Sequence, residues 1–479
     1  MCERLRYLSW WQKIILAVGS LGLLAHLTVS VVRVGHKIGD YDINREFGRR
    51  FLAGEPLYQG GQCFNYMPIS ALYWAPLALV PPRAGLALRY LTALACLFIT
   101  IRILHGMVGG QRSVGSGPRT WRIEDRGSRI EKASRSSILS PQSSLPGSNP
   151  RSSVLILVAL ILCGHYLIRD FDDGGPNVIL LAILLCGMNC VWRGRDIMGA
   201  FWLGLGIAVK ITPGLFLGFL VWKRRWWLAA YTTAATVLWI LLPAVWMGPT
   251  SWWRHQRQWN EVASSVLHDS ADPGRDLNEQ RVQNQALKPA LLRYLITYPP
   301  GHPLRLAQAG YVDFLNWPPS TANRIVSGIL LALGVIFCWR TYGRGTDLKS
   351  VLRRKHPQTP RALLGEMSGL LLLILLFSPV TWLQHFVFAL PAIFWVVAEQ
   401  QAKPRMLRLW GIALFAILSL LMNRELLGRE SYLLLLSYHT HTLCLLLMFV
   451  LVVAGLSSSE CSAEGERLLE LPHAKGQAA

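Results

Sequence analysis

The chain has 479 residues, of which 52% are hydrophobic and only 16% are charged, whereas soluble domains are about a quarter charged. This composition excludes an ordinary soluble domain, and the apolar residues come in blocks long enough to span a bilayer. The net charge of +21 would suggest nucleic acid as the partner of a soluble protein. Here the basic residues lie mainly in loops between apolar blocks, so we expect contact with the lipid bilayer and no nucleic acid.

The sequence predicts an all-α polytopic membrane protein with about twelve transmembrane helices. The first unit, 1–104, holds a retained first helix at 14–32, an outer loop and a second span at 84–104. The Arg- and Ser-rich insert 105–153 that follows is expected to be disordered and cytoplasmic. Only one crossing can then precede the insert. The short apolar run 67–79 is therefore an interfacial or re-entrant helix, since it rises only about 20 Å.

The transmembrane core is predicted over 154–456, and it contains a long outer loop at 247–322. A polar cytoplasmic tail occupies 457–479. The expected spans of the core place most basic loops on the cytoplasmic side of the cell inner membrane; they are 154–168, 177–192, the paired short helices 197–209 and 213–222, 227–246, 325–339, 363–377, 386–397, 407–422 and 432–456.

The first outer segment carries two carboxylates, Asp40 and Asp42, immediately before a predicted amphipathic surface helix. Apolar residues recur there every four positions, and Gly54 ends the pattern. A carboxylate at the membrane surface can remove a proton from an attacking hydroxyl, so both are candidate catalytic bases. The position of Asp42 favours capping of the helix over catalysis, whereas Asp40 lies outside the cap position, which favours catalysis. The pattern leaves the choice between them open.

Arginines on this outer segment depart from the positive-inside pattern. Arg45 and Arg49 lie on the predicted surface helix, on the side where basic residues are otherwise scarce. We therefore interpret both as candidate ligands of an anionic substrate group.

Lys210 interrupts the paired short helices at Ala-Val-Lys-Ile-Thr-Pro. A lysine between two apolar half-helices is costly in lipid, which makes it a candidate functional residue. Its ammonium suits phosphate oxygens. The alternative is that Lys210 extends to the membrane interface without binding anything.

The segment 378–385 joins two predicted helices at the outer side. Trp382 offers an aromatic platform and His385 a proton-handling imidazole, so both are candidates for a sugar site. The alternative is a plain interhelical turn with a satisfied polar histidine. Asn284 and Gln285 in the outer loop are weaker candidates for substrate contact.

Signatures of nucleotide and metal binding are missing. The chain has no phosphate-binding Gly-rich loop and no His or Cys spacing typical of a metal site. We therefore expect no cofactor and no metal, and a donor that arrives already activated on a lipid.

Four stretches together resemble glycosyltransferase family 87, whose members have the GT-C fold and use polyprenyl-phosphate-linked sugars. The resemblance extends from about residue 39 to about residue 397, apart from the insert, and the stretches are 40–44 with 52–58, 64–68 with 75–79, 204–213, and 378–385. It departs from the family pattern at Asn44, in the Gly-Gly-Pro-Asn of 174–177, and at Gln384-His385, where the family has paired histidines.

The resemblance implies an inverting transfer of a hexose such as mannose from a polyprenyl-phosphate donor to a lipid or glycan acceptor, on the extracytoplasmic side. It places the base at Asp40 and needs no metal. Lys210, with Arg45 or Arg49, would hold the leaving phosphate. Two other functions are compatible with the residues alone, a transporter or flippase of lipid-linked sugars and a non-catalytic membrane scaffold.

Overall fold

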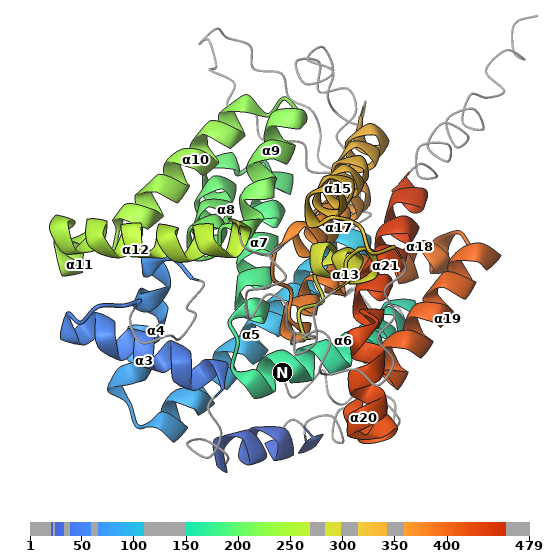
Figure 1. The fold of residues 1–479 in the computed structure, drawn as a ribbon. Helices are drawn as coiled ribbons and strands as arrows, with labels where there is room; N and C mark the ends of the chain where they lie inside the picture. Colours follow the sequence, from blue (N-terminus) through green and yellow to red (C-terminus); the bar gives the residue numbers. More distant parts are fainter. Residues whose placement is uncertain are drawn as a thin grey trace, which may run out of the picture.

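The computed structural model describes residues 21–22, 24–32, 39–58, 66–109, 150–268, 283–297, 315–342 and 359–456. Throughout these ranges the regular structure is helical, without strands (Figure 1). In chain order the elements are α3 (Asp40–Ala53), η1 (Pro68–Ser70), α4 (Ala71–Leu79), α5 (Pro82–Gly109), α6 (Pro150–Asp173), α7 (Asn177–Trp192), α8 (Asp196–Val209), η2 (Thr212–Gly214), α9 (Leu215–Trp222), α10 (Trp226–Leu241), α11 (Ala244–Met247), α12 (Pro249–His268), α13 (Leu287–Leu295), α15 (Pro319–Thr341), α17 (Pro360–Phe377), η4 (Leu383–Ala389), α18 (Leu390–Ala402), α19 (Met406–Leu421), α20 (Arg424–Ser437) and α21 (Thr440–Leu456).

Helices that can cross a membrane confirm the multi-pass prediction. Among the described residues, six are long and apolar enough to do so, or seven if a bent pair near the C-terminal end is counted as one span. Five shorter apolar helices accompany them, and one of these is the run Pro68–Leu79. The total of about twelve spans stays a prediction. Most of the insert, 110–149, and the tail 457–479 lie outside the described residues.

The insert is flanked by longer helices than the sequence predicts. Helix α5 continues to Gly109 and α6 begins at Pro150, so both ends of the predicted insert 105–153 are helical.

The first outer segment folds as two helices in contact, α3 and α4. Helix α3 ends at Gly54, whose φ of 68° is the left-handed conformation typical of a glycine cap. Midway along α3, a Cβ on Gly48 would lie 2.4 Å from the backbone carbon of Trp74 in α4. Glycine at this position therefore lets the two helices approach closely. This packing fixes the start of α3, where Asp40 lies.

The densest part of the core surrounds α18. Its residues Leu390 to Glu399 are all buried, and the indole of Trp395 fits against two glycines, Gly365 of α17 and Gly455 of α21. The same core includes η4 and α6, which contact each other and α18. Because η4 carries Gln384 and His385 and is buried along its whole length, these site residues are held in the packed core.

One predicted span is wrong. The run 432–456 is not a single helix, because α20 ends at Ser437 and α21 begins at Thr440. Between them His439 has a φ of 51°, which a right-handed helix of L-residues cannot accommodate. The polar stretch Ser-Tyr-His-Thr-His-Thr at 437–442 interrupts the apolar run at this point, a sequence signal that the predicted span passed over.

Candidate active site

Asp40 and Gln384 bring the first outer segment and the segment 378–385 together. The Gln384 Nε2 atom donates a hydrogen bond of 3.0 Å to Asp40 Oδ2, although the residues are 344 positions apart. Loss of hydration at this packed position raises the pKa of Asp40 above its usual 3.8, while the Gln384 hydrogen bond and the nearby cations Arg169, Arg89 and Lys210 oppose the rise. A carboxylate with a raised pKa is a stronger proton acceptor.

Asp42 has a structural role at the start of α3. Its Oδ2 accepts a 3.3 Å hydrogen bond from the backbone N–H of Gly39, the residue before the helix. This bond satisfies a backbone donor that the helix leaves unpaired. The geometry therefore supports capping for Asp42 and leaves Asp40 as the carboxylate bonded to another segment.

Lys210 and His385 form the second long-range pair. Their Nζ and Nε2 atoms are 3.2 Å apart across 175 positions, and Nζ lies 5.8 Å from the centre of the Tyr66 ring. The backbone is extended at Lys210, with φ −142° and ψ 125°, just before Pro213, which has no N–H to continue the ladder of α8. The helix break thus projects the ammonium toward η4.

The imidazole of His385 is oriented by the loop that carries it. Its Nδ1 accepts a 3.2 Å hydrogen bond from the backbone N–H of Trp382. The remaining ring nitrogen, Nε2, faces Lys210. Trp382 thus contributes a backbone donor, and its side chain is only partly buried; a sugar contact by the indole stays a prediction.

Asn284 and Gln285 hold the segment 378–385 in place. The Asn284 side chain donates to Pro379 O at 2.9 Å and accepts from Thr381 N at 2.9 Å. Gln285 donates from its backbone to Thr381 O at 2.8 Å and from its side chain to Leu436 O at 2.9 Å. Both side chains are fully buried, so this geometry gives them a supporting role, while their contact with substrate stays a prediction.

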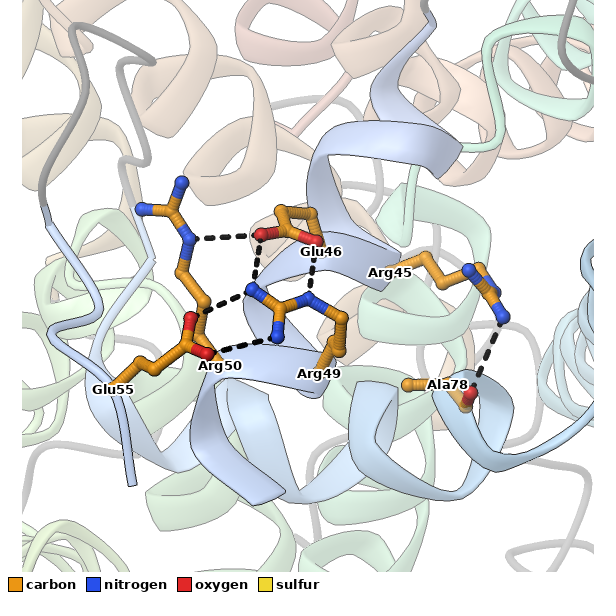
Figure 2. A network of polar contacts seen from close by, with 6 residues as sticks. All are labelled: Arg45, Glu46, Arg49, Arg50, Glu55 and Ala78. Carbon is orange, nitrogen blue, oxygen red and sulfur yellow. Dashed lines mark hydrogen bonds and ion pairs between the residues drawn. The ribbon is translucent and has the colours of Figure 1, made fainter. Parts of the chain in front are cut away.

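The arginines of α3 are engaged within the protein (Figure 2). Arg45 donates to the carbonyls of Ala78 and Val80 at 3.2 and 3.1 Å, at the C-terminal end of α4. Arg49 pairs with two carboxylates, Glu46 at 2.8 Å and Glu55 at 2.6 Å. An anionic ligand would have to compete with these partners, and its binding by the two arginines stays a prediction.

A buried ion pair supports the site, and neither of its residues is among the candidates predicted from the sequence. Arg89 of α5 and Asp170 of α6 are both fully buried and lie 3.5 Å apart. Arg89 also donates to the carbonyls of Asp170, at 2.9 Å, and of Gly175. An arginine within an apolar span is itself a signal of function or buried pairing, and it could have revealed this pair.

Asp170 fixes the turn on which the start of α3 rests. Its carboxylate accepts hydrogen bonds from Asn177 Nδ2 at 2.8 Å and from the N–H of Val178 at 3.2 Å. A Cβ on Gly174 in this turn would lie 2.5 Å from Tyr41 Cβ, so the turn packs directly beside Asp40. The Gly-Gly-Pro-Asn of 174–177 is therefore a structural support of the site.

A cavity of about 250 Å³ adjoins Lys210. It lies between η1, α4, α7, α8 and α10, and its lining is mainly apolar, with Tyr66, Ser70, Tyr73, Ile183, Val209 and Trp239 among its residues. Val209 precedes Lys210 in the chain, and the Tyr66 ring lies near its ammonium. A cationic group at the edge of an apolar cavity suits a ligand with a phosphate head and a hydrocarbon tail.

The family model of glycosyltransferase family 87 matches residues 64–355, more than half of the chain. The chain belongs to this family. The resemblance inferred from its motifs is thereby confirmed, and this family 87 member is a membrane glycosyltransferase of the GT-C type. The matched range contains Lys210, whereas Asp40 and His385 lie on either side of it.

Curated relatives of this family 87 member are mycobacterial enzymes. A polyprenol-phosphate-mannose-dependent alpha-(1-2)-phosphatidylinositol mannoside mannosyltransferase of Mycobacterium tuberculosis is 25% identical over 367 residues, which cover 74% of this chain and 69% of the relative. A corresponding pentamannoside mannosyltransferase of that organism is 23% identical over 351 residues, covering 73% and 62%. A similar enzyme of Mycolicibacterium smegmatis is 25% identical and covers 49% and 50%. No solved structure matches the chain.

Proposed function

We propose that this family 87 member transfers mannose from a polyprenyl-phosphate donor to a hydroxyl group of a membrane lipid or glycan. The observation that carries the proposal is the convergence of three distant segments through two contacts, Asp40 with Gln384 and His385 with Lys210. The names of the relatives, which are mannosyltransferases dependent on polyprenol-phosphate-mannose, support the donor and the sugar.

Asp40 is the proposed base. The acceptor oxygen bonds to the anomeric carbon while the bond from that carbon to the phosphate oxygen breaks. The hydroxyl proton passes to Asp40, and the bonding electron pair leaves with the polyprenyl phosphate. Attack from the face opposite the phosphate inverts the anomeric carbon. The raised pKa of Asp40 suits the proton transfer.

Lys210 and His385 are the proposed ligands of the donor phosphate. A neutral imidazole whose Nδ1 accepts a hydrogen bond carries its hydrogen on Nε2, so Nε2 and the Lys210 ammonium would both direct hydrogens toward one phosphate oxygen. Such donors stabilise the charge that grows on the leaving group. The neighbouring apolar cavity would receive the first part of the polyprenyl chain.

The proposed membrane arrangement follows the distribution of charge. With the basic loops in the cytoplasm, about twelve spans place α3 and α4 at the outer surface of the inner membrane as juxtamembrane helices. The amphipathic α3 and the short α4 (9 residues) fit this position better than a crossing. Donor and acceptor would then meet at the outer face.

The decisive test is transfer of radiolabelled mannose in proteoliposomes supplied with polyprenyl-phosphate-mannose and a lipid extract as acceptor. Asp40→Asn is expected to insert and fold normally but to lose at least about a hundredfold in rate, the lower range for loss of a general base. Asp42→Asn is the matched control and should retain most activity. Full activity in Asp40→Asn would contradict the assignment, while donor movement across the bilayer without any product would favour a flippase.

A further inference from the structure

Helix α12 leaves the end of a predicted span and changes direction at once. The apolar stretch Trp226–Met247 is long enough to cross the membrane, and Gly248 follows it with φ 75° and ψ 156°, a conformation that favours glycine. From there α12, at Pro249–His268, runs across the direction of α10 (Figure 1). This geometry is typical of a helix that lies on the membrane surface.

One side of α12 is anchored to the protein. Trp252 Nε1 donates a hydrogen bond of 2.8 Å to Ile240 O. Trp259 is only 6% exposed and packs in one cluster with Met67 and Ile69. Because Ile69 also lines the cavity beside Lys210, the anchored side of α12 is continuous with the proposed donor site.

The other side of α12 exposes Trp253, Arg254 and Arg257. The indole of Trp253 is 55% exposed, and the Arg257 guanidinium lies 6.0 Å from its ring centre. Within the part of the chain that the structure describes, neither arginine has an acidic partner. The arginines of α3 differ in this respect, since Arg49 and Arg50 both pair with Glu46.

We propose that Arg254, Arg257 and Trp253 form a docking surface for the phosphate of an anionic phospholipid in the membrane leaflet next to the active site. The basic groups attract the anionic headgroup, and the exposed indole is suited to the level of the headgroups. The leaflet assignment rests on the proposed function, but the lipid contact itself does not.

Native mass spectrometry of the full chain with added phosphatidylglycerol tests the docking surface. The double variant R254Q/R257Q is expected to bind this lipid roughly tenfold more weakly, because it loses two charges at the headgroup level. R224Q/R225Q is the matched control. It removes the same charge from the exposed turn before α10, about 24 Å of helix away from α11, and should bind nearly as the unaltered protein does.

Equal retention of phosphatidylglycerol by R254Q/R257Q and the unaltered protein would overturn the proposal, as would an equal loss in both double variants. Retention of phosphatidylcholine should be similar in all of them and verifies the fold. Asp40→Asn should bind phosphatidylglycerol normally. If the unaltered protein binds the lipid at α12 but transfers no sugar from the polyprenyl-phosphate donor, the proposed function is contradicted and the docking surface is not.

Discussion

Gln384 donates its side-chain hydrogen bond to Asp40 over 3.0 Å, and this contact joins η4 to the first residue of α3. The bond lowers the pKa of Asp40 against the stronger effect of burial, which raises it. Gln384 therefore acts on the candidate base without having to touch the substrate.

Replacing Gln384 should shift the pH dependence of transfer. In Gln384→Leu the pKa of Asp40 rises further, because the bond that stabilises its ionised form is lost. The rate falls when a base becomes protonated, so the acid limb of the profile of kcat/KM against pH should move to higher pH. Gln384→Glu should move it in the same direction, because a second carboxylate disfavours ionisation of the first.

A profile of Gln384→Leu with an unchanged midpoint and a uniformly lower rate would show that Gln384 only maintains the fold. Circular dichroism of the variant verifies that it is helical before the profiles are compared.

Asp40→Asn should stabilise the protein at neutral pH while it abolishes transfer. The pKa of Asp40 is raised in the folded state from 3.8, so the folded protein binds more protons than the unfolded chain. Its stability therefore decreases as the pH rises from 3.8 through the raised pKa, and the ionised carboxylate is a net cost above it. Asparagine avoids this cost and can still accept the hydrogen bond from Gln384.

Thermal unfolding in detergent measures this effect. The melting temperature of Asp40→Asn should exceed that of the unaltered protein at neutral pH, and the difference should vanish below about pH 4, where both side chains are neutral. A lower melting temperature at neutral pH would mean that the Asp40 charge is stabilised by its neighbours, contrary to the direction of its pKa.

Asn284→Ala should weaken both the fold and the reaction. The change leaves the buried N–H of Thr381 without its acceptor at 2.9 Å, and an unpaired buried donor costs about 1–3 kcal/mol. The segment that carries His385 also becomes looser, so kcat should fall. Asn260→Ala on the exposed side of α12 is the control and should change neither quantity. If Asn284→Ala lowers the stability but leaves the rate of transfer unchanged, Asn284 supports the fold and has no effect on the reaction.

Some residues of this site can be recognised in the sequence and others cannot. Asp40, Lys210 and His385 each stood out, because a polar group at the end of an apolar block is locally conspicuous. Gln384 did not, because its importance lies in a contact 344 positions away. The break at His439 did leave a signal, because the polar stretch 437–442 interrupts the apolar run there.

Asp170 is not among the site residues predicted from the sequence, because its surroundings in the chain suggest an exposed position. The sequence places it among acidic residues next to Gly174, which is typical of an exposed turn. In the fold it belongs to α6 and is fully buried against Arg89. Pattern alone cannot show that a carboxylate at a helix end has a buried cation as its partner.

The interaction energy between Arg89 and Asp170 can be tested by a double-variant cycle. Arg89→Leu leaves Asp170 as a buried charge without its cation, a loss that typically costs about 3–5 kcal/mol. Because Asp170 holds the turn beside Asp40 through Asn177 and Val178, transfer should fall together with stability.

The combined variant Arg89→Leu with Asp170→Asn should recover much of this stability, because no uncompensated charge remains and asparagine can still accept a hydrogen bond through its side-chain oxygen. Unfolding free energies of the four proteins give the coupling energy, which should favour the native pair by more than 1 kcal/mol, the level seen for interacting neighbours. If the two single changes were simply additive, the ion pair would contribute nothing of its own. The turn would then be held by the hydrogen bonds of Asp170 alone.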